Sequence, residues 1–356
     1  MTHDEIFSFS APLPTQPLEE PFVFSVIGAA HGHIYGMCRG LIEQGARLKA
    51  VYDQDPAVAA GFARDFPEVE IASAEDSIYD DPEIRLIVCA AVPVRRAEVG
   101  VRAMMAGKDF FVDKAPMITL EQVGLIRKTC SETGRKCFIF YGESIANEST
   151  VFALDLIRRG VIGDVFHING TAPHRLNALT RPDWFFRRSC TGGILTDLVC
   201  HQLHQFLEFA DTNTAAVDFS RVANYNHPQF PELDDFGDLD CTASNGITGH
   251  LQVDWFTPDG LRSWGDSRMV IQGTKGTIEL RKNCDIARDS RGSNVYVVTE
   301  DGEFYENVTG KVSMPFFPNL ILDCINRTET AMNPQRALHA IELSIRAQTA
   351  ALQRKG

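Results

Sequence analysis

Two groups of residues in this sequence combine types and spacings that suit chemistry on a bound molecule. The first contains Asp197 and His201, four residues apart in a segment predicted to be a helix over about 192–209. On an α-helix this spacing places both side chains on one face. A carboxylate beside an imidazole fixes the orientation of the ring and favours its charged form, as a general acid or base requires. An ordinary surface pair is the alternative interpretation. His204 adds a second imidazole, but the sequence offers no further ligands, so no metal site is predicted.

The second group is Asp113-Lys114-Ala115-Pro116, at the end of an apolar strand predicted over 109–114. Ligands of parallel sheets bind just outside the carboxyl ends of the strands. A lysine held there can have its pKa shifted by burial and by neighbouring charges. A solvated loop lysine is the alternative interpretation.

A strand, a glycine turn and a helix near the start of the chain would position these groups. The apolar run 22–27 leads into Gly28, after which Ile34, Met37 and Leu41 recur at helical spacing. A second strand, over 48–53, ends on Asp53. This order is typical of a dinucleotide-binding unit, in which N–H groups at the helix start hold the pyrophosphate and the carboxylate holds the ribose hydroxyls.

The glycine fingerprint of such a turn, G-x-G-x-x-G, is incomplete here. Its three glycine positions hold Gly28, Ala30 and His33, with His31 and Gly32 also in the turn. Ala30 adds only a methyl group, whereas His33 is large for a position of close helix–strand packing. Taken alone, the motif leaves two interpretations open, dinucleotide binding and an ordinary strand–turn–helix.

The pattern of elements predicts two domains after an N-terminal arm over 1–20. Strands and helices alternate over 21–146, which predicts a doubly wound parallel α/β domain of the Rossmann type. Successive strands with short connections over 147–356 predict an α+β domain with a large open, mainly antiparallel sheet. Its final helix is able to pack back on the first domain.

Composition excludes several classes of function. The net charge is −13 and there is no run of Lys or Arg, which argues against nucleic acid as a partner. No apolar run approaches the ~20 residues that span a bilayer, and the first residues lack the features of a signal peptide. The nine cysteines form no C-x-x-C pairs, as expected for reduced thiols in a cytoplasmic protein.

The glycine turn, the Asp-Lys-x-Pro strand end and the later Gly-Gly-x-Leu-x-Asp-x-x-x-His helix, in this order, resemble the glucose–fructose oxidoreductase / inositol dehydrogenase (Gfo/Idh/MocA) family. The resemblance runs from about residue 22 to 352. It implies a dinucleotide-binding domain followed by a substrate and oligomerisation domain with a large open sheet. It also implies NAD(P)-dependent oxidation or reduction of a sugar, cyclitol or related compound, and a homodimer or homotetramer formed through the C-terminal sheet.

By this resemblance Lys114, Asp197 and His201 match the family's catalytic residues. His201 would move the hydroxyl proton, Lys114 would stabilise the alkoxide, and Asp197 would orient the substrate or the imidazole. Arg175 and Trp184, with Asp197 and His201, are the expected substrate contacts. The expected cofactor contacts are Gly28, Ala30, His31, Gly32, His33, Asp53, Ala91, Pro93, Arg96, Asp113 and Lys114.

The sequence departs from the family pattern at two places. Asp-Lys-Ala-Pro replaces Glu-Lys-Pro, so an extra residue separates the lysine from the proline. After the fourth strand the family often has a proline and then a histidine, but this chain has Pro93-Val94-Arg95-Arg96. A cation there could meet a cofactor phosphate or an acidic substrate, with a solvated helix start as the alternative.

These observations lead to three functional hypotheses. The first is a dehydrogenase or reductase of a polyol, sugar or sugar-derived compound that uses NAD rather than NADP, because the Asp53 carboxylate would repel a 2′-phosphate. The second is a glycosidase-like enzyme that retains NAD and returns the hydride within one cycle. The third is a non-catalytic sensor or scaffold, suggested by Ala30 and His33. Arginines 175, 181, 187 and 188 hint at an acidic substrate.

Overall fold

A parallel sheet with the strand order β3-β2-β1-β4-β5-β6 forms the core of one unit of the chain, called here the six-stranded unit. The computed structural model describes residues 1–9 and 21–355, and the chain divides into two units. The six-stranded unit contains residues 21–140 and 315–338, and the eight-stranded unit contains 1–9, 141–314 and 339–355. The last boundary between the two units, at 338/339, falls inside the final helix of the chain. Residues 10–20 of the expected arm lie outside the described part.

The predicted doubly wound domain is confirmed by the pairing of these strands, all of which are parallel. Strand β1 is buried along its whole length, which explains its unbroken apolar sequence. The strands are β1 (Val23–Ile27), β2 (Arg47–Tyr52), β3 (Glu70–Ile71), β4 (Leu86–Cys89), β5 (Asp109–Asp113) and β6 (Cys137–Phe140).

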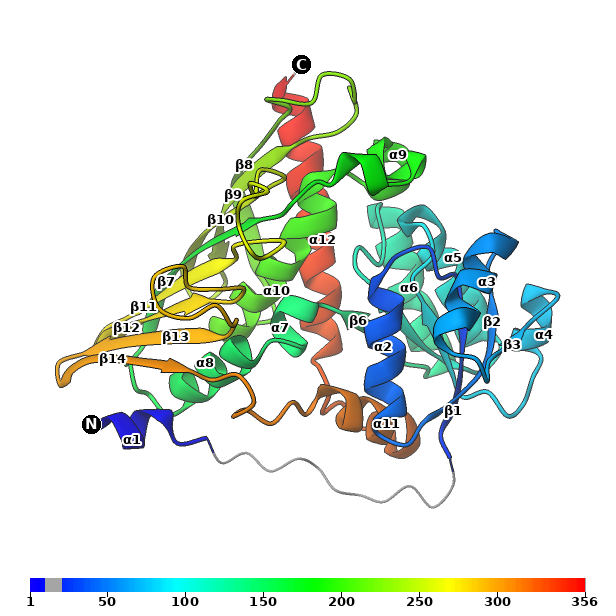
Figure 1. The fold of residues 1–356 in the computed structure, drawn as a ribbon, viewed down its shortest axis with the longest axis horizontal. Helices are drawn as coiled ribbons and strands as arrows, with labels where there is room; N and C mark the ends of the chain where they lie inside the picture. The colour runs from blue at the N-terminus through cyan, green and yellow to red at the C-terminus, as the bar shows by residue number, and fades with distance from the viewer. Residues whose placement is uncertain (10–20, 356) are drawn as a thin grey trace. The chain divides into compact units, whose positions relative to one another are not determined.

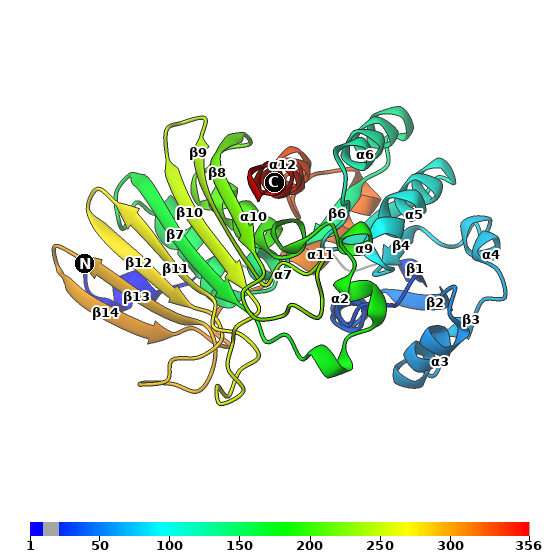
Figure 2. The same cartoon turned by 90° about the horizontal axis from the view of Figure 1, so that it is seen from above.

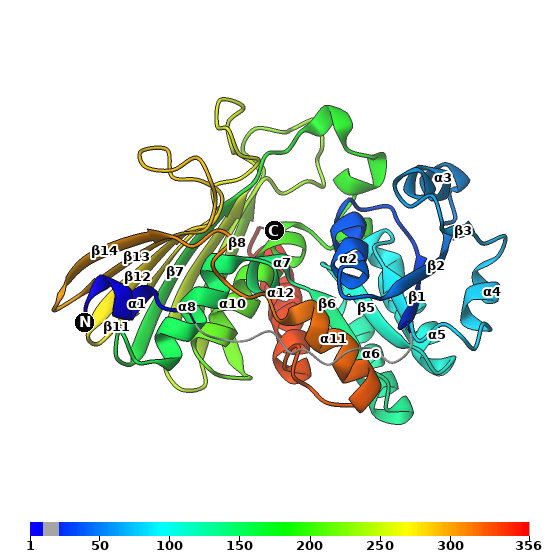
Figure 3. The same ribbon diagram turned by 60° about the horizontal axis from the view of Figure 1, so that its bottom comes forward.

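Helices cover both faces of this sheet, with α2 and α3 on one face and α5 and α6 on the other (Figure 2). Local signals fix their ends: Asp55 caps α3 with Pro56 at the first position, and Gly134 ends α6 in a left-handed conformation. The helix α11 returns late in the chain to pack beside α2 (Figure 3). The helices are α2 (His33–Ile42), α3 (Pro56–Asp65), α4 (Glu75–Tyr79), α5 (Pro93–Met105), α6 (Leu120–Thr133) and α11 (Phe316–Asn326).

The eight-stranded unit is built on one sheet in the order β14-β13-β12-β11-β7-β10-β9-β8 (Figure 1). Only β7 and β10 pair in parallel, so the predicted large, mainly antiparallel sheet is confirmed. The strands are β7 (Val165–Pro173), β8 (Ala215–Ala223), β9 (Phe236–Ala243), β10 (Thr248–Asp254), β11 (Arg268–Gly273), β12 (Gly276–Arg281), β13 (Asn294–Thr299) and β14 (Gly302–Asn307).

The helices α8 and α10 lie along one face of this sheet and contact β12, β13, β7 and β10. The helices of the unit are α1 (His3–Phe7), α7 (Gly142–Ile145), α8 (Glu148–Arg158), α9 (Arg188–Thr191), α10 (Cys200–Phe209) and α12 (Pro334–Lys355), the last of which begins in the six-stranded unit. Two short 3₁₀ turns, Ala178–Thr180 and Asp183–Phe186, precede α9.

The helix predicted over about 192–209 is present from residue 194 onward, but it is not α-helical throughout. A wide π-helical turn, Leu195–Val199, precedes α10, which begins at Cys200. Several short elements were also not predicted. They include α1, which begins with a capping box between Thr2 and Glu5, and β14, which pairs with β13 at the edge of the sheet. Among the helices of residues 1–9 and 21–355, none has both the length and the apolar content needed to cross a lipid bilayer.

Two glycines of α2 provide a test of the packing between α2 and α11. A Cβ added at Gly40 would lie 2.3 Å from a ring atom of Phe317, whereas one at Gly36 would meet nothing within 4 Å. We expect Gly40→Ala to lower the free energy of unfolding by about 1–3 kcal/mol, as overpacking does. Gly36→Ala should raise it by up to about 1 kcal/mol, because alanine favours a helix. Urea unfolding of both variants checks this; equal effects would contradict the packing.

Candidate active site

The turn after β1 requires glycine only at its first fingerprint position. Gly28 has φ +83°, and a Cβ there would lie 2.4 Å from the Cβ of Ala91. Its N–H donates to the carbonyl of Tyr52 (2.8 Å), and its own carbonyl accepts from Ala90 (2.9 Å), so the turn is fixed to both neighbouring strands. Ala30 and His33 have ordinary negative φ values. Alanine and histidine are therefore compatible with the backbone at the other two positions.

The carboxylate of Asp53 is held against this turn at the end of β2. One oxygen accepts from the N–H of Ala29 (2.7 Å) and the other from the N–H of Asp55 (2.9 Å). A carboxylate oxygen has more than one acceptor site, so both oxygens keep capacity for hydroxyl donors of a ligand. The position agrees with the role expected for a ribose-binding acid.

His33 occupies the third fingerprint position because its side chain has a partner across the sheet edge. His33 Nδ1 lies 2.8 Å from one carboxylate oxygen of Asp113, and His31 Nδ1 lies 2.9 Å from the other. The two rings meet edge to face, with centroids 4.4 Å apart. The missing glycine is thus replaced by an imidazole that connects the turn to the end of β5.

Arg96 is fully buried, and its N–H groups face the protein. Nη2 donates to the Asp113 carboxylate at 3.0 Å, and Nε donates to the carbonyl of Ala91 at 2.7 Å. Nη1 donates to the carbonyls of residues 113, 114 and 115. Arg95 instead lies on the other side of α5, next to Glu75 and Glu98. The cation expected to meet a phosphate or an acidic substrate is therefore bound internally.

The charges around Asp113 determine its protonation and that of His31. Burial alone would raise the pKa of Asp113, but His33, Arg96 and His31 together hold that pKa well below its usual range. Burial lowers the pKa of His31 to about 4, although Asp113 acts in the opposite direction. His31 is therefore neutral at pH 7, and its Nδ1 lies beside both the Asp113 carboxylate (2.9 Å) and the backbone N–H of His33 (3.3 Å).

The atoms of His31, His33 and Asp113 that could hold a metal ion lie within 4.8 Å of one another. A tetrahedral zinc ion with bonds of about 2.0–2.2 Å would separate its ligand atoms by roughly 3.3 Å. The observed separations of 2.8 and 2.9 Å are instead those of hydrogen bonds. Because Arg96 also donates to the same carboxylate, we interpret the group as a hydrogen-bonded ion cluster.

Lys114 directly follows this cluster and is buried. Pro93 is also buried and begins α5 at a position where proline is favoured. Gly32 is exposed at the start of α2. The six-stranded unit thus gathers the turn, Asp53, Ala91, Asp113 and Lys114 at the carboxyl edge of one sheet.

In the eight-stranded unit, the glycines before Asp197 allow close approach of a side chain from α12. Gly193 has φ +92°, and a Cβ there would lie 2.5 Å from the amide carbon of Gln348. That amide accepts from the N–H of Leu195 (2.9 Å) and donates to Asp234 (2.9 Å). Gln348 therefore fixes the start of the wide turn that carries Asp197. Nothing in the sequence links it to the site, because it comes more than a hundred residues later.

His201 is buried in α10, with its ring 6.1 Å from that of Tyr141. His204 stacks on the same tyrosine at 4.7 Å, and its Nδ1 lies 2.9 Å from the hydroxyl of Ser144. His204 is therefore a hydrogen-bonded core residue. Asp197 lies within the π-helical turn and His201 lies at the start of α10, so the two residues do not have the simple α-helical relation expected.

The arginines near this helix are engaged within the eight-stranded unit. Arg175 donates to the carbonyls of Pro258, Leu261 and Ser263. Arg181 lies over the rings of Phe185 (4.4 Å) and Trp255 (5.4 Å), and Arg188 lies 3.5 Å from Asp234. Burial lowers the pKa of Arg181, and the nearby charge of Asp197 opposes this shift.

A small pocket of about 20 Å³ lies next to Asp197, with room for a single small group. Its walls include the rings of Phe185 and Trp255 and the carboxylates of Glu232 and Asp234. The half-buried Trp184, an expected substrate contact, packs edge-on against Phe185 at 6.2 Å. Sequence reasoning did not find Trp255 or Glu232, which lie on separate segments with no motif around them.

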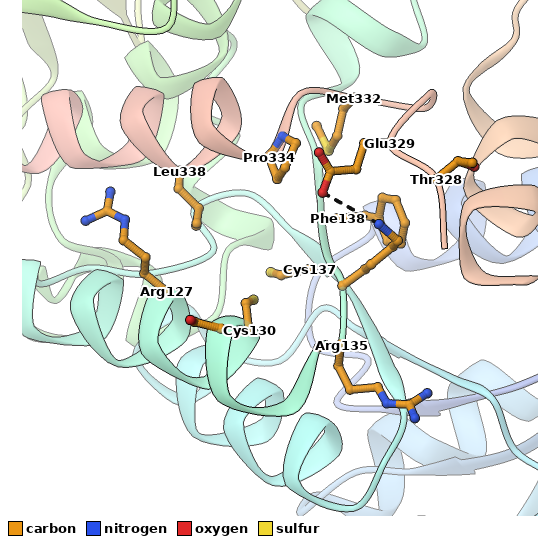
Figure 4. A pocket seen from close by; sticks show the side chains of 13 residues that line it. Arg127, Cys130, Arg135, Cys137, Phe138, Thr328, Glu329, Met332, Pro334 and Leu338 are labelled. Atoms are coloured by element: carbon orange, nitrogen blue, oxygen red, sulfur yellow. Dashed lines mark ion pairs between the residues drawn. The ribbon is translucent and has the colours of Figure 1, made fainter. Parts of the chain in front are cut away.

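A larger cavity of about 310 Å³ lies at the opposite end of the six-stranded sheet, where β6 begins (Figure 4). Arg127 and Cys130 of α6, Cys137 and Phe138 of β6, and the segment from Thr328 to Leu338 line it. Lys136 Nζ lies 3.7 Å from a carboxylate oxygen of Glu329. Because Cys137 pairs near the start of β5 and Asp113 ends β5, this cavity is separate from the glycine turn.

The doubly wound sheet and its glycine turn define a Rossmann-type fold, and the chain adds an α+β unit to it. A solved structure from Erwinia carotovora atroseptica SCRI1043, of a protein assigned as an oxidoreductase, matches with a TM-score of 0.91 at 45% identity over 93% of this chain and 98% of that one. A levoglucosan dehydrogenase solved with NADH shares the fold, with a TM-score of 0.77 at 17% identity over 94% of this chain and 98% of that one.

Residues 151–279 match the model of the GFO/IDH/MocA C-terminal domain, and the chain belongs to the Gfo/Idh/MocA family of oxidoreductases. Among curated proteins, D-xylose dehydrogenase of Paenarthrobacter nicotinovorans is 28% identical over 35% of this chain and 34% of its own length. A glycosyl hydrolase family 109 protein of Shewanella putrefaciens is 25% identical over 37% of this chain and 31% of its own length. The resemblance predicted from the motifs is confirmed.

The lowered pKa of His31 predicts how stability depends on pH. Between pH 6.5 and about 4 the unfolded chain binds a proton at His31 that the folded chain does not. Unfolding free energy should therefore fall as the pH is lowered through this window, by up to about 3 kcal/mol from this group. The variant His31→Asn keeps a donor but cannot titrate, so its stability should fall less steeply. Urea unfolding at several pH values measures the difference between the curves; parallel curves would contradict the assignment.

Proposed function

We propose that the protein is an NAD-dependent oxidoreductase that transfers hydride between nicotinamide and a hydroxyl or carbonyl carbon of a sugar, cyclitol or sugar-derived compound. The main supporting observation is the Gly28 turn with the Asp53 carboxylate fixed against it. Family membership supports the same class of reaction. The bound nicotinamide would supply the hydride acceptor or donor.

The chain's own residues fit a dinucleotide at this turn. Glycine is required where the chain passes Ala91, and the helix start after Gly32 provides N–H groups for a pyrophosphate. Asp53 would accept the adenosine ribose hydroxyls and repel a 2′-phosphate, and the next residue, Gln54, brings no cation to bind one. His31 and His33, with Nδ1 held by Asp113, would present their other ring nitrogens to the ligand. These features favour NAD over NADP.

The residues proposed for chemistry are Lys114, Asp197 and His201. Lys114 would stabilise negative charge on the substrate oxygen, and His201 would accept or return its proton. Asp197 would orient the substrate or the imidazole. Arg175, Arg181 and Arg188 make internal contacts, and carboxylates line the pocket beside Asp197, which favours an uncharged polyol over the acidic substrate suggested by the sequence.

The second candidate is a glycosidase-like cycle in which NAD accepts the hydride and returns it. The similarity to a glycosyl hydrolase family 109 protein supports this second candidate function. Net production of NADH distinguishes the two, because only the dehydrogenase releases reduced cofactor. The sensor or scaffold hypothesis loses support, because Ala30 has an ordinary backbone conformation and His33 has a defined partner.

We further propose a cytoplasmic homodimer or homotetramer assembled through the eight-stranded sheet. The cysteines of the described residues are all free thiols, as in reducing compartments. The domain boundary predicted at 146/147 likewise stays a proposal, while the contacts of the chain divide it at 140/141.

Cofactor preference tests the role of Asp53. We expect the protein to bind NADH at least about tenfold more tightly than NADPH, a difference of about 1.4 kcal/mol. Asp53→Asn removes the repulsion of the 2′-phosphate, so NADPH affinity should rise and the ratio should shrink. Titration of nicotinamide fluorescence measures both constants. Tighter NADPH binding by the natural sequence would overturn the account of Asp53, and binding of neither would overturn the proposed function.

Turnover of a screened sugar or cyclitol tests the role of Lys114. We expect Lys114→Ala to lower kcat by about a thousandfold, because oxyanion stabilisation is lost, while NADH still binds. Lys128→Ala, at an exposed position of α6 in the same unit, is the matched control and should keep full activity. Absorbance at the NADH band follows the reaction. Unchanged activity of the Lys114 variant would remove it from the mechanism.

A further inference from the structure

We propose that Arg96 is a positioning residue for Lys114, and that the Asp113 carboxylate links this positioning to the state of the nucleotide turn. The inference rests on the proposed function for the role of Lys114. It concerns contacts within the six-stranded unit, which the family assignment does not supply.

Arg96 holds the backbone on both sides of Lys114 with one nitrogen. Nη1 donates to the carbonyl of Asp113 at 3.0 Å, to that of Lys114, and to that of Ala115 at 3.2 Å. Nε holds the carbonyl of Ala91, at the end of the neighbouring strand, at 2.7 Å. The direction in which the Lys114 side chain leaves the backbone is therefore set by a single guanidinium.

Only arginine can make this set of contacts. Its five N–H groups lie in one rigid plane, whereas lysine offers a single rotating ammonium with three. The guanidinium is fully buried, so no water molecule from solvent can replace a lost donor. A lysine at this position would keep the positive charge near Asp113 but leave carbonyl groups without donors.

Asp113 connects Arg96 to the exposed side of the turn. Its side chain and that of Arg96 are 0% exposed, while His31 and His33 are 19% and 37% exposed. One carboxylate oxygen receives His31 and Arg96, and the other receives His33. A ligand that moves either imidazole changes the hydrogen bonds of Asp113, and through Asp113 those of Arg96.

The neighbouring residue provides a matched control. Arg95 lies in the same turn of α5, but its guanidinium lies near Glu75 and Glu98 and makes none of these contacts. Arg95→Lys changes the same functional group by the same amount, without altering the backbone around Lys114.

The first experiment compares Arg96→Lys with Arg95→Lys in the full chain. In Arg96→Lys we expect kcat to fall by about 100-fold, as for a small misplacement of a reacting group, while the NADH dissociation constant stays within about threefold. Arg95→Lys should change neither by more than about twofold. An unchanged kcat in Arg96→Lys overturns the proposal, as does an equal loss in both variants.

The second experiment does not depend on turnover. Lysines are reductively methylated with ¹³C-formaldehyde, and the NMR signal of Lys114 is identified by its absence in Lys114→Arg. We expect this signal to shift when NADH binds to the natural sequence, and the shift to be lost in Arg96→Lys although NADH fluorescence still reports binding. A Lys114 signal insensitive to NADH in the natural sequence overturns the link through Asp113.

These readouts separate the inference from the proposed function. If no sugar or cyclitol is turned over but the Lys114 signal behaves as expected, the proposed function fails and the positioning by Arg96 stands. If Arg96→Lys does not fold, His33→Asn with Arg96 intact takes its place. That variant should reduce the NADH-induced shift of Lys114 by half or more, and a full shift would overturn the link.

Discussion

The carboxylate of Asp113 is fully buried at the end of β5, and it is stabilised by Arg96, His31 and His33. A charged group without water costs several kcal/mol unless other groups replace its hydrogen bonds. Here the replacement comes from two other segments, the turn after β1 and the first turns of α5. The residue types at these three places therefore depend on one another. Loss of any one would leave a buried charge with too few partners.

This dependence explains features that looked unrelated in the sequence. Three of them meet at one cluster: a histidine in place of a fingerprint glycine, Arg96 in the segment where the family often has a histidine, and aspartate in place of glutamate before Lys114. The parallel sheet makes the meeting possible, because the carboxyl ends of β1, β2, β4 and β5 lie on the same edge. The glycine turn therefore lacks the complete fingerprint because side-chain contacts of His31 and His33 with Asp113 hold it in place.

The sequence allowed prediction wherever one local signal dominated. The buried strands and the position of Gly28 were predicted from apolar runs and backbone geometry, and two helix ends were predicted from Pro56 and Gly134. Prediction from the sequence failed where contacts between distant segments determine the role of a residue. Arg96 looked like a ligand-binding cation, since nothing local shows that its donors face carbonyls of residues 113–115. Gln348 and Trp255 carried no signal at all, because a motif cannot show which distant strand or helix approaches it. The π-helical turn at Leu195–Val199 was missed because no residue type in it distinguishes a π-helical turn from an α-helical one.

That turn has an evolutionary meaning. A π-helical turn is an α-helix with one extra residue, and such insertions persist at functional sites. Deleting Leu198 or Val199 would restore a regular helix but leave Asp197 and His201 three residues apart instead of four. The relation between this acid and this imidazole is therefore recorded in the length of the segment as well as in its residues. A relative with a one-residue deletion here would keep both residue types of the motif but change their relative orientation. The length of the segment would reveal this divergence, whereas the residue types alone would not.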